Sequence, residues 1–291
     1  MSETAGPPKI FDRALLRRRL RQAMSKGAPD FLMTRAAEDL LDRLLTVKRE
    51  FPRALDLGSP SGHFAQAVVA SGRARPLRAG GHAGDVIADE EAPPFAPGSF
   101  DLIVSGMSLQ WVNDLPGALA QARRMLAPDG LFLACLAGGA SLVELRAALA
   151  QAEEEITGGA SPRVSPFVDV RDMGGLLQRA GFALPVADVD SFTLRYNSMF
   201  ALMGDLRAMG AANVLDKRSR KPLRRDVVAR AAQIYAERFC DADGRVRASF
   251  EIIWASGWAP HESQQKPAKP GSAMMSLEDA MKSAPKSDSS I

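Results

Sequence analysis

Residues 54–68 read ALDLGSPSGHFAQAV. The apolar run around Asp56 predicts a buried strand, and the alanine-rich residues after Gly62 predict a helix. Gly58 and Gly62 stand at the two ends of the turn between them. A strand that leads through a glycine turn into a helix is typical of open α/β sheets, which bind nucleotides at this turn.

The segments that follow continue the alternation of strands and helices. Short strands are expected at residues 74–80 and 85–89, and a strongly apolar strand at 100–105. A helix that starts after Asp114 leads into a further apolar strand at residues 131–138. This alternation predicts a Rossmann-like α/β fold with a mainly parallel, doubly wound sheet.

The pattern changes after residue 140, where helical segments dominate. A strand is expected at residues 183–196, a helical insertion at about 195–240, and a final strand near 246–257. Because the chain returns after this excursion, we expect a seven-stranded sheet whose final strand is antiparallel and lies beside the strand near 183–194.

The chain divides into three parts on this pattern. Residues 1–45 are expected to form N-terminal helices, and residues 46–260 to form the α/β domain. Residues 261–291 are rich in Pro, Ser and Lys and are too polar to bury a face, so a mostly disordered tail is predicted.

The two N-terminal helices differ in character. The first, within residues 10–30, carries an imperfect apolar stripe among several arginines. It fits a solvated helix that packs on the core by one edge, or a helix that contacts an acidic partner or a membrane surface. The second, residues 31–48, has Asp30 in position to cap it. Its core-facing residues are predicted to be Leu32, Ala36, Leu40 and Leu44.

Composition and charge argue against several classes of protein. The 291 residues have a net charge of +3 and 6% aromatics, with no long basic tract, which does not favour nucleic-acid binding. Cys135 and Cys240 cannot form a disulfide framework and indicate a reducing compartment. The longest nearly apolar run, residues 131–143, is too short and too rich in glycine to span a bilayer. A soluble, cytoplasmic protein is therefore expected.

The glycine turn narrows the choice of cofactor. A phosphate-binding P-loop would end in GK[ST], and a nicotinamide fingerprint would need a third glycine and an acidic residue about 20 positions further on. The sequence has neither. The S-adenosylmethionine variant of this sheet fits better, with Asp56, Gly58 and Gly62 under the amino acid end of the cofactor.

Two later segments complete this predicted cofactor site. Asp89 and Glu90 follow the strand at residues 85–89, where an acidic loop would meet the adenine. Ser105 ends the next apolar strand, whose carboxyl end would line the methyl-donor pocket.

Several longer stretches resemble one known family. They include IFDRALLRRR, SFDLIVSGMSLQWVNDLPGAL, SPRVSPFVDVRDMGGLLQRAGF and GWAPHESQQKPAKPGSA. Together they resemble the complex I assembly factor 5 family of bacteria and mitochondria. These are methyltransferase-fold proteins related to the malonyl-acyl-carrier-protein methyltransferase of biotin synthesis. The similarity runs from Ile10 to Ala273.

This resemblance implies a class I S-adenosylmethionine-dependent methyltransferase fold. It also implies a role in hydroxylating an arginine of a core NADH dehydrogenase subunit during complex I assembly, so the expected partner is a protein. The match begins at Ile10, which leaves no room for a mitochondrial transit peptide. A bacterial cytoplasmic protein, working beside the inner membrane, is the simpler interpretation.

The sequence departs from the family pattern at two points. Pro60 stands where the family has the middle glycine of the turn, and no acidic residue follows the second strand to hold the ribose hydroxyls. Proline lacks an N–H, so the loop loses one donor. The turn is either a working cofactor loop or a structural relic, and we expect weak binding of S-adenosylmethionine.

The catalytic residues are not fixed by the sequence, and the candidates are Trp111, Asp114 and His261. Trp111 would wall the donor pocket or pack in the core. Carboxylates such as Asp114, Glu90 or Glu91 would be needed to grip a guanidinium group. His261 would act as an acid or base, or would fasten the last strand to the following loop.

No metal site is predicted. Three histidines, His63, His82 and His261, are few for an iron site with two histidines and a carboxylate. A capping or solvent-facing position is expected for His63.

Two functions from different classes remain open at this point. In the first, the chain is an enzyme that holds donor and acceptor in line over the glycine turn. In the second, the cofactor site is vestigial and the helical insertion clamps a partner subunit.

Overall fold

A computed structural model describes residues 8–265 of the chain. Within these residues, strands form one seven-stranded sheet in the order β3-β2-β1-β4-β5-β7-β6. Neighbouring strands from β3 to β5 are parallel, whereas β7 is antiparallel to both β5 and β6. The strands are β1 (Ala54–Leu57), β2 (Pro76–Gly80), β3 (Val86–Ile87), β4 (Phe100–Gly106), β5 (Leu126–Ala137), β6 (Ala183–Tyr196) and β7 (Val246–Trp258).

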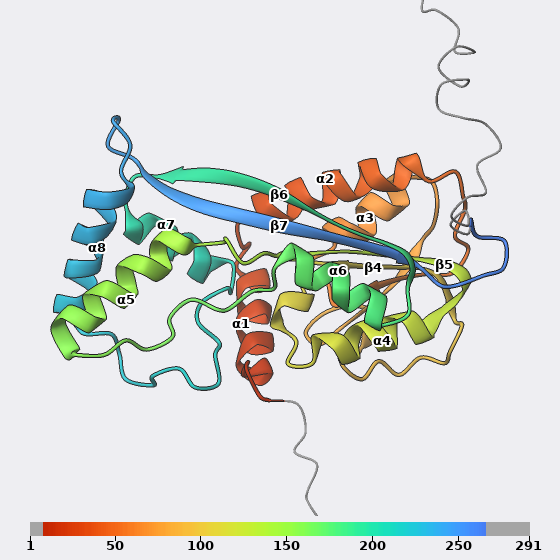
Figure 1. Cartoon of the computed structure of the whole chain (residues 1–291), viewed down its shortest axis with the longest axis horizontal. Coiled ribbons are helices and arrows are strands. Elements are labelled where there is room, and N and C mark those ends of the chain that lie inside the picture. The colour runs from red at the N-terminus through yellow and green to blue at the C-terminus, as the bar shows by residue number, and fades with distance from the viewer. Residues whose placement is uncertain (1–7, 266–291) are drawn as a thin grey trace, which may run out of the picture. The chain divides into compact units, whose positions relative to one another are not determined.

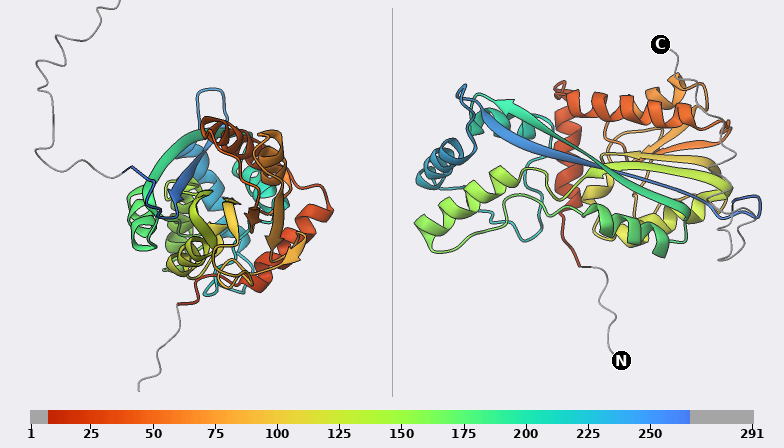
Figure 2. Two further views of the ribbon diagram at one scale, coloured as in Figure 1. Left: turned by 90° about the vertical axis from the view of Figure 1, so that its right-hand side faces the viewer. Right: turned by 45° about the horizontal axis from the view of Figure 1, so that its top comes forward.

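Helices cover both faces of the sheet (Figure 2). They are α1 (Arg13–Ser25), α2 (Phe31–Thr46), α3 (His63–Ala70), α4 (Leu115–Met125), α5 (Val143–Thr157), α6 (Val170–Arg179), α7 (Met199–Ala208) and α8 (Arg225–Phe239), with a short 3-10 helix, η1 (Leu109–Trp111). On one face, α2 and α3 bury residues such as Leu40 and Phe64 against Trp254 of β7. On the other face, Leu119 of α4 and Leu177 of α6 belong to the second core.

The antiparallel strands β6 and β7, which are joined through α7 and α8, lie beside a separate group of helices (Figure 1). The two strands pair along their length, from Ala183 opposite Trp258 to Tyr196 opposite Val246. Where β6 ends and β7 begins, α5, α7 and α8 pack around Tyr235, with Leu145, Leu202 and Ile234 in the same core. These three helices therefore lie beside the carboxyl ends of the parallel strands.

Helix α1 lies between this helical group and the sheet (Figures 1 and 2). Leu15 and Leu16 pack with Val214 and Leu215 of the segment that follows α7. Arg19 Nη1 donates to the backbone oxygens of residues 212 and 213, at 3.0 and 2.8 Å. The helix packs by one edge, and the packed edge includes arginines as well as the apolar stripe.

The predicted architecture is confirmed. The sheet has seven strands, and its last strand inserts antiparallel between β5 and β6. Leu32, Ala36, Leu40 and Leu44 of α2 are all buried, as the periodicity predicts. The strand expected at residues 85–89 is only Val86 and Ile87.

The prediction that Asp30 caps α2 is confirmed for its position but wrong for its hydrogen bond. Asp30 occupies the N-cap position, but its side chain makes no capping hydrogen bond. Its carboxylate instead contacts His63 Nε2 at 3.1 Å, because the start of α3 lies beside the start of α2.

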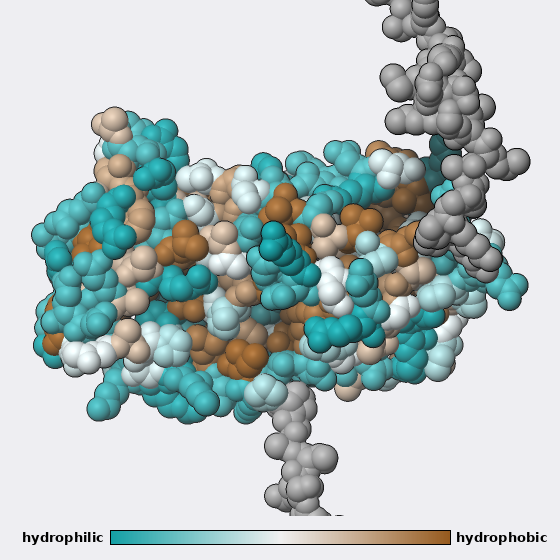
Figure 3. All heavy atoms as spheres, viewed as in Figure 1, coloured by the Kyte–Doolittle hydropathy of each residue, from teal (hydrophilic) through white to brown (hydrophobic). Residues whose placement is uncertain are grey.

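The described residues up to Pro260 form one compact unit, and His261 and the four described residues after it lie outside that unit. Most of the tail expected to be disordered lies outside the described residues. Over the described residues on the face drawn in Figure 3, hydrophobic patches are small and separated by hydrophilic side chains. None of the helices in the described part of the chain has the length and apolar character needed to cross a bilayer.

Candidate cofactor and acceptor site

The glycine turn, residues 58–62, lies at the carboxyl ends of β1 and β4, and we call it the floor of the site. Gly58 has φ +80, and its N–H donates to Ala79 O at 2.7 Å. Ser59 Oγ accepts the N–H of Gly106 at 2.9 Å, and Ser105 Oγ donates to Leu57 O at 2.7 Å. The hydroxyl of Ser105 thus ties β4 to β1.

The Asp56 side chain lies inside the fold, below the floor, and is not exposed at its surface. Its side chain is buried, and the closest charged group is Arg78 Nε of β2, at 3.6 Å. Burial raises the pKa of the Asp56 carboxyl to about 6, although hydrogen bonding and the Arg78 charge act in the opposite direction. Asp56 therefore contributes to the electrostatics of the turn from below.

The acidic loop of residues 89–91 is held by α1. Glu90 is buried beside Gly58, where its Oε2 accepts a hydrogen bond from Arg13 and its Oε1 accepts one from Ser108 Oγ at 2.8 Å. Arg13 Nη1 also lies 2.9 Å from Asp89 and 3.3 Å from Glu91. One guanidinium group thus pairs with three successive carboxylates.

Gly58 is required by this arrangement. A Cβ at residue 58 would lie 2.7 Å from Glu90 Cγ and would also overlap the Ser108 hydroxyl. Its positive φ disfavours any other residue independently of that contact.

Arg17 of α1 occupies the space next to the end of β2. It pairs with Asp89, and its Cδ lies 3.1 Å from where a Cβ of Gly81 would stand. This is the place at which the family pattern has the ribose-binding acid. The guanidinium of Arg17 therefore fills the space beside Gly81.

His82 and Pro60 close the same region from the side of the turn. His82 Nε2 contacts Pro60 O at 3.0 Å, and burial lowers the pKa of His82. What remains above the turn is a cavity of about 20 Å³, which we call the loop cavity; Arg13, Arg17, Gly58, His82, Glu90 and Trp111 are among its lining residues. That volume is enough for about one water molecule.

The other sequence-predicted residues lie in different surroundings. Asp114 caps α4, because its Oδ1 accepts the N–H of Gly117 at 2.8 Å, and its own N–H donates to Glu91 Oε1 at 2.9 Å. Gly62 precedes α3 as its N-cap residue. His63 Nδ1 contacts Ser61 Oγ at 2.8 Å. His261 lies outside the compact unit that ends at Pro260, and its Nδ1 contacts Ser263 Oγ at 2.7 Å.

Trp111 is common to three neighbouring cavities. It lines the loop cavity, and its ring packs against Phe11 and Phe167 with centroid separations of 5.6 and 6.1 Å. It also lines an inner cavity of about 100 Å³, bounded by Pro60, Met107, Gln110, Leu142, Phe250 and Glu251 among others.

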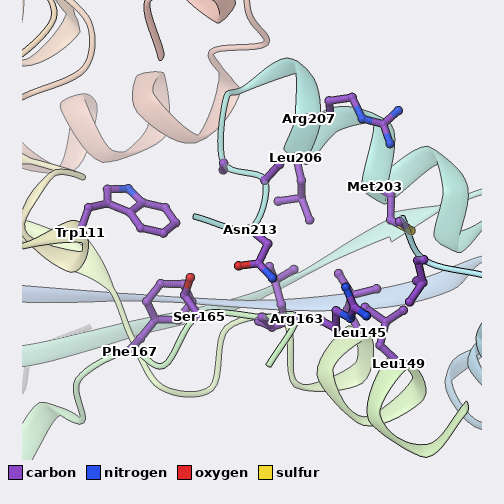
Figure 4. Close-up of a pocket in the computed structure, with 15 residues that line it drawn as sticks. Trp111, Leu145, Leu149, Arg163, Ser165, Phe167, Met203, Leu206, Arg207 and Asn213 are labelled. Carbon is purple, nitrogen blue, oxygen red and sulfur yellow. The ribbon is translucent and has the colours of Figure 1, made fainter. Parts of the chain in front are cut away.

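The third cavity, which we call the outer cavity, has a volume of about 230 Å³. Figure 4 shows Trp111 and Phe167 at one end of it, and Leu145, Leu149 and Met203 at the other. The inner and outer cavities share Trp111, Leu142, Phe167, Leu206 and Ala211. The three cavities therefore lie next to one another around Trp111, from the glycine turn to the helical group, and we call this largely apolar row of cavities the passage.

Several residues of this passage were missed by the sequence analysis. Met107 has φ +50, a backbone conformation that is uncommon for a residue with a side chain and that marks the end of β4 as a special position. Gln110 and Glu251 line the inner cavity, and Arg13 and Arg17 cover the turn. The only signal for the two arginines is their spacing of four residues, which places them on one helical face.

In the part of the chain that the structure describes, no group of three or more His, Cys, Asp or Glu side chains is arranged to hold a metal ion.

Comparisons with known proteins agree with this fold. A family model of the methyltransferase domain matches residues 31–185. The protein named arginine-hydroxylase NDUFAF5, mitochondrial, of Danio rerio is 39% identical over 289 residues, which cover 94% of this chain and 90% of the relative. The chain belongs to the NDUFAF5 family of methyltransferase-domain proteins. The resemblance drawn from the sequence motifs is thereby confirmed.

Two further matches extend this picture. The malonyl-[acyl-carrier protein] O-methyltransferase of Methylovorus sp. (strain MP688) is 35% identical over 277 residues, covering 86% of this chain and 90% of the relative. A solved structure from Bacillus halodurans C-125, described as a methyltransferase, has a TM-score of 0.51 at 16% identity and covers 76% of this chain and 97% of its own. The last match supports the fold alone.

Proposed function

We propose that this chain is an enzyme that binds S-adenosylmethionine over its glycine turn and modifies an arginine side chain of a protein. The observation that carries the proposal is the passage of three cavities that meet at Trp111. It would connect a cofactor on the glycine turn with a space that is large enough for a side chain. The NDUFAF5 relatives are named arginine-hydroxylases, which favours hydroxylation as the reaction.

The floor of the site fits the cofactor. The cradle at Gly58 admits no Cβ, the turn ends at the N-terminus of α3, and carboxylates of Asp89 and Glu90 stand beside it. We assign the cofactor contacts to Asp56, Gly58, Gly62, Asp89, Glu90 and Ser105, with Asp56 and Ser105 acting by shaping the floor.

When bound, S-adenosylmethionine would supply a sulfonium that activates its methyl group for transfer. Hydroxylation of an arginine would in addition need an oxygen donor that is also the oxidant, such as dioxygen with a two-electron reductant. This chain's own contribution is to hold the acceptor against that end of the cofactor and to exclude water. Trp111, at the junction of the three cavities, is positioned for this task, and the apolar walls of the outer cavity would keep the passage dry. Asp114 would act by ordering η1 and the start of α4.

The side chains of α1 leave too little space for the cofactor unless the helix shifts. The loop cavity holds about 20 Å³, whereas pockets for drug-sized ligands are roughly 300–1,000 Å³. We therefore expect weak binding, with α1 moving as the cofactor enters. The same observation favours the alternative function, in which the site is vestigial and the helical insertion serves as an assembly module.

Titration with S-adenosylmethionine separates the two functions. The enzyme proposal predicts saturable calorimetric binding to the full chain, and loss of that binding in Gly58→Ala, whose Cβ would overlap Glu90. Gly72→Ala is the matched control, because Gly72 also has a positive φ (+69) but has nothing within 4 Å of the point where a Cβ would stand.

The outcome is read from the wild type and both variants together. If Gly58→Ala loses the heat of binding while Gly72→Ala retains it, the turn is the cofactor floor. If the wild-type chain gives no binding, the assembly-module function replaces the enzyme proposal.

The proposed cellular partner is a core subunit of NADH dehydrogenase, following the motif resemblance. A cytoplasmic location with contact to the inner membrane fits that partner, because α1 carries the arginines Arg18 and Arg21 on its surface.

A further inference from the structure

The inner cavity has an unusual balance of polar groups. Among its described lining residues there is one carboxylate, Glu251, and one side-chain amide, Gln110, but no Arg, Lys or His. The rest of the lining is mostly apolar. A cavity of this kind offers hydrogen-bond acceptors and negative charge to whatever enters it.

Glu251 is fixed in place at one end of its carboxylate. Oε2 accepts the N–H of Ala140 at 2.8 Å, and the carboxylate lies against Gly138, where a Cβ would stand 2.8 Å from Glu251 Cδ. Ser141 Oγ holds the backbone of the same residue through contacts of 3.0 and 3.1 Å. Among the described residues, none makes a hydrogen bond or ion pair with Oε1.

Gln110 provides a second acceptor. Its Nε2 donates to Met107 O at 2.9 Å, which fixes the amide. Its Oε1 is buried without a hydrogen-bond partner among the described residues, and the residue is only 9% exposed. A buried acceptor without a donor is unfavourable, so a ligand that donates to it is stabilised by more than the hydrogen bond alone.

The position of the two residues relates them to the cofactor floor. Glu251 lies in β7 beside the carboxyl end of β5, where Gly138 N donates to Glu251 O at 2.9 Å. Gln110 lies in η1, just after β4. Pro60 of the glycine turn lines the same cavity. The nearby cations, Arg13 and Arg17, are already paired with residues 89–91.

We propose that the inner cavity receives a guanidinium group, and that Glu251 and Gln110 are its specificity-determining residues. This inference rests on the proposed function. A guanidinium carries five N–H donors and a fixed positive charge, which match two acceptors and one negative charge, and it has no lone pair that would need a donor. A carboxylate substrate is disfavoured, because Glu251 would repel it and no cation of the described residues lines the cavity.

The earlier candidates for this role are already engaged. Glu90 is paired with Arg13, Glu91 accepts the N–H groups of Asn113 and Asp114, and Asp114 caps α4. Within the described residues, Glu251 is thus the carboxylate of the passage that keeps an oxygen for a substrate.

The inference is tested with n-butylguanidinium and its neutral isostere n-butylurea, titrated against the full chain by NMR. The wild-type chain should bind the guanidinium more tightly than the urea. Glu251→Gln keeps an acceptor for the Ala140 N–H but removes the charge, and should weaken guanidinium binding by about 10- to 150-fold with little effect on the urea. Gly138→Ala, which displaces the carboxylate without removing it, should do the same.

Glu155→Gln is the matched control. Glu155 is an exposed carboxylate of α5 that pairs with Arg230 at 2.6 Å, so this variant changes net charge equally but should keep the preference for guanidinium. Equal binding of the two probes by the wild type, or an unchanged preference in Glu251→Gln, would overturn the assignment.

A parallel titration with S-adenosylmethionine distinguishes this inference from the proposed function. Glu251→Gln should bind the cofactor as the wild type does. A chain that prefers guanidinium but binds no cofactor would uphold the inference and reject the proposed function. A chain that binds the cofactor without preferring guanidinium would do the reverse.

Discussion

Asp56 is the residue at which the folding of the turn and its charge are most closely coupled. Its carboxyl is buried near Gly58 and lies 3.6 Å from Arg78 Nε, and burial raises its pKa from 3.8 to about 6. The folded chain therefore binds a proton more tightly at this residue than the unfolded chain does. By linkage, this residue makes the fold less stable as the pH rises from about 4 to 6.

Asp56→Asn removes that dependence. A shift of about two pKa units corresponds to about 3 kcal/mol, so the variant should gain up to that much relative to the wild type between pH 4 and pH 7. Urea unfolding of both proteins at the two pH values measures the difference. If the difference between them is the same at both pH values, the carboxyl has the same pKa in the folded and unfolded states and the burial argument is wrong.

Some residues of the site could be predicted from the sequence, and others could not. Gly58, Gly62 and Asp56 could be predicted as parts of a turn because they are close in sequence and their types suit a strand-to-helix connection. Glu251 could not, because it reaches the site only through the pairing of β7 with β5. Arg13 was missed for a similar reason, since its partner Glu90 is 77 residues away along the chain.

Among the elements, α1 has the most influence on the site. It buries Leu15 and Leu16 against the segment after α7 and inserts Arg13 and Arg17 over the glycine turn. The amphipathic pattern could indicate that this helix packs by one edge, but not which arginines face inward. The periodicity of α2 was more informative, because its stripe is entirely apolar.

Two variants of α1 should have unequal effects on stability. The Arg13 and Glu90 side chains are only 11% and 9% exposed, so Arg13→Ala leaves a buried carboxylate unpaired and should reduce the free energy of unfolding by about 3–5 kcal/mol. Arg17 and Asp89 are 32% and 34% exposed, so Arg17→Ala should change it by less than about 1 kcal/mol.

Arg17→Ala should also tighten binding of S-adenosylmethionine, because it clears space beside Gly81. Denaturant unfolding and calorimetry on the two variants give both readouts. Equal destabilisation by the two substitutions would contradict the unequal burial of the ion pairs, and weaker cofactor binding in Arg17→Ala would show that this guanidinium assists the cofactor.

At the scale of the whole molecule, the fold brings together residues from both halves of the chain. The parallel half supplies the glycine turn and η1, and the antiparallel pair of β6 and β7 supplies Glu251. Side chains of α5 and α7 line the outer cavity. The antiparallel place of the last strand beside β6 could be predicted, because a helical excursion and return fits such an insertion. The passage of cavities could not, since it depends on how side chains from these segments pack around Trp111.

The central claim is that this passage delivers a protein arginine to a cofactor held over Gly58. It is tested most directly by mass spectrometry of the NADH dehydrogenase core subunits from a strain that lacks this chain and is complemented with wild type, Gly58→Ala or Gly72→Ala at matched abundance. The account predicts one arginine that gains an oxygen with wild type and with Gly72→Ala, and that stays unmodified in the deletion strain and with Gly58→Ala. A gain of a methyl group would retain the enzyme and change the reaction, whereas identical subunit masses in all four strains would contradict the account.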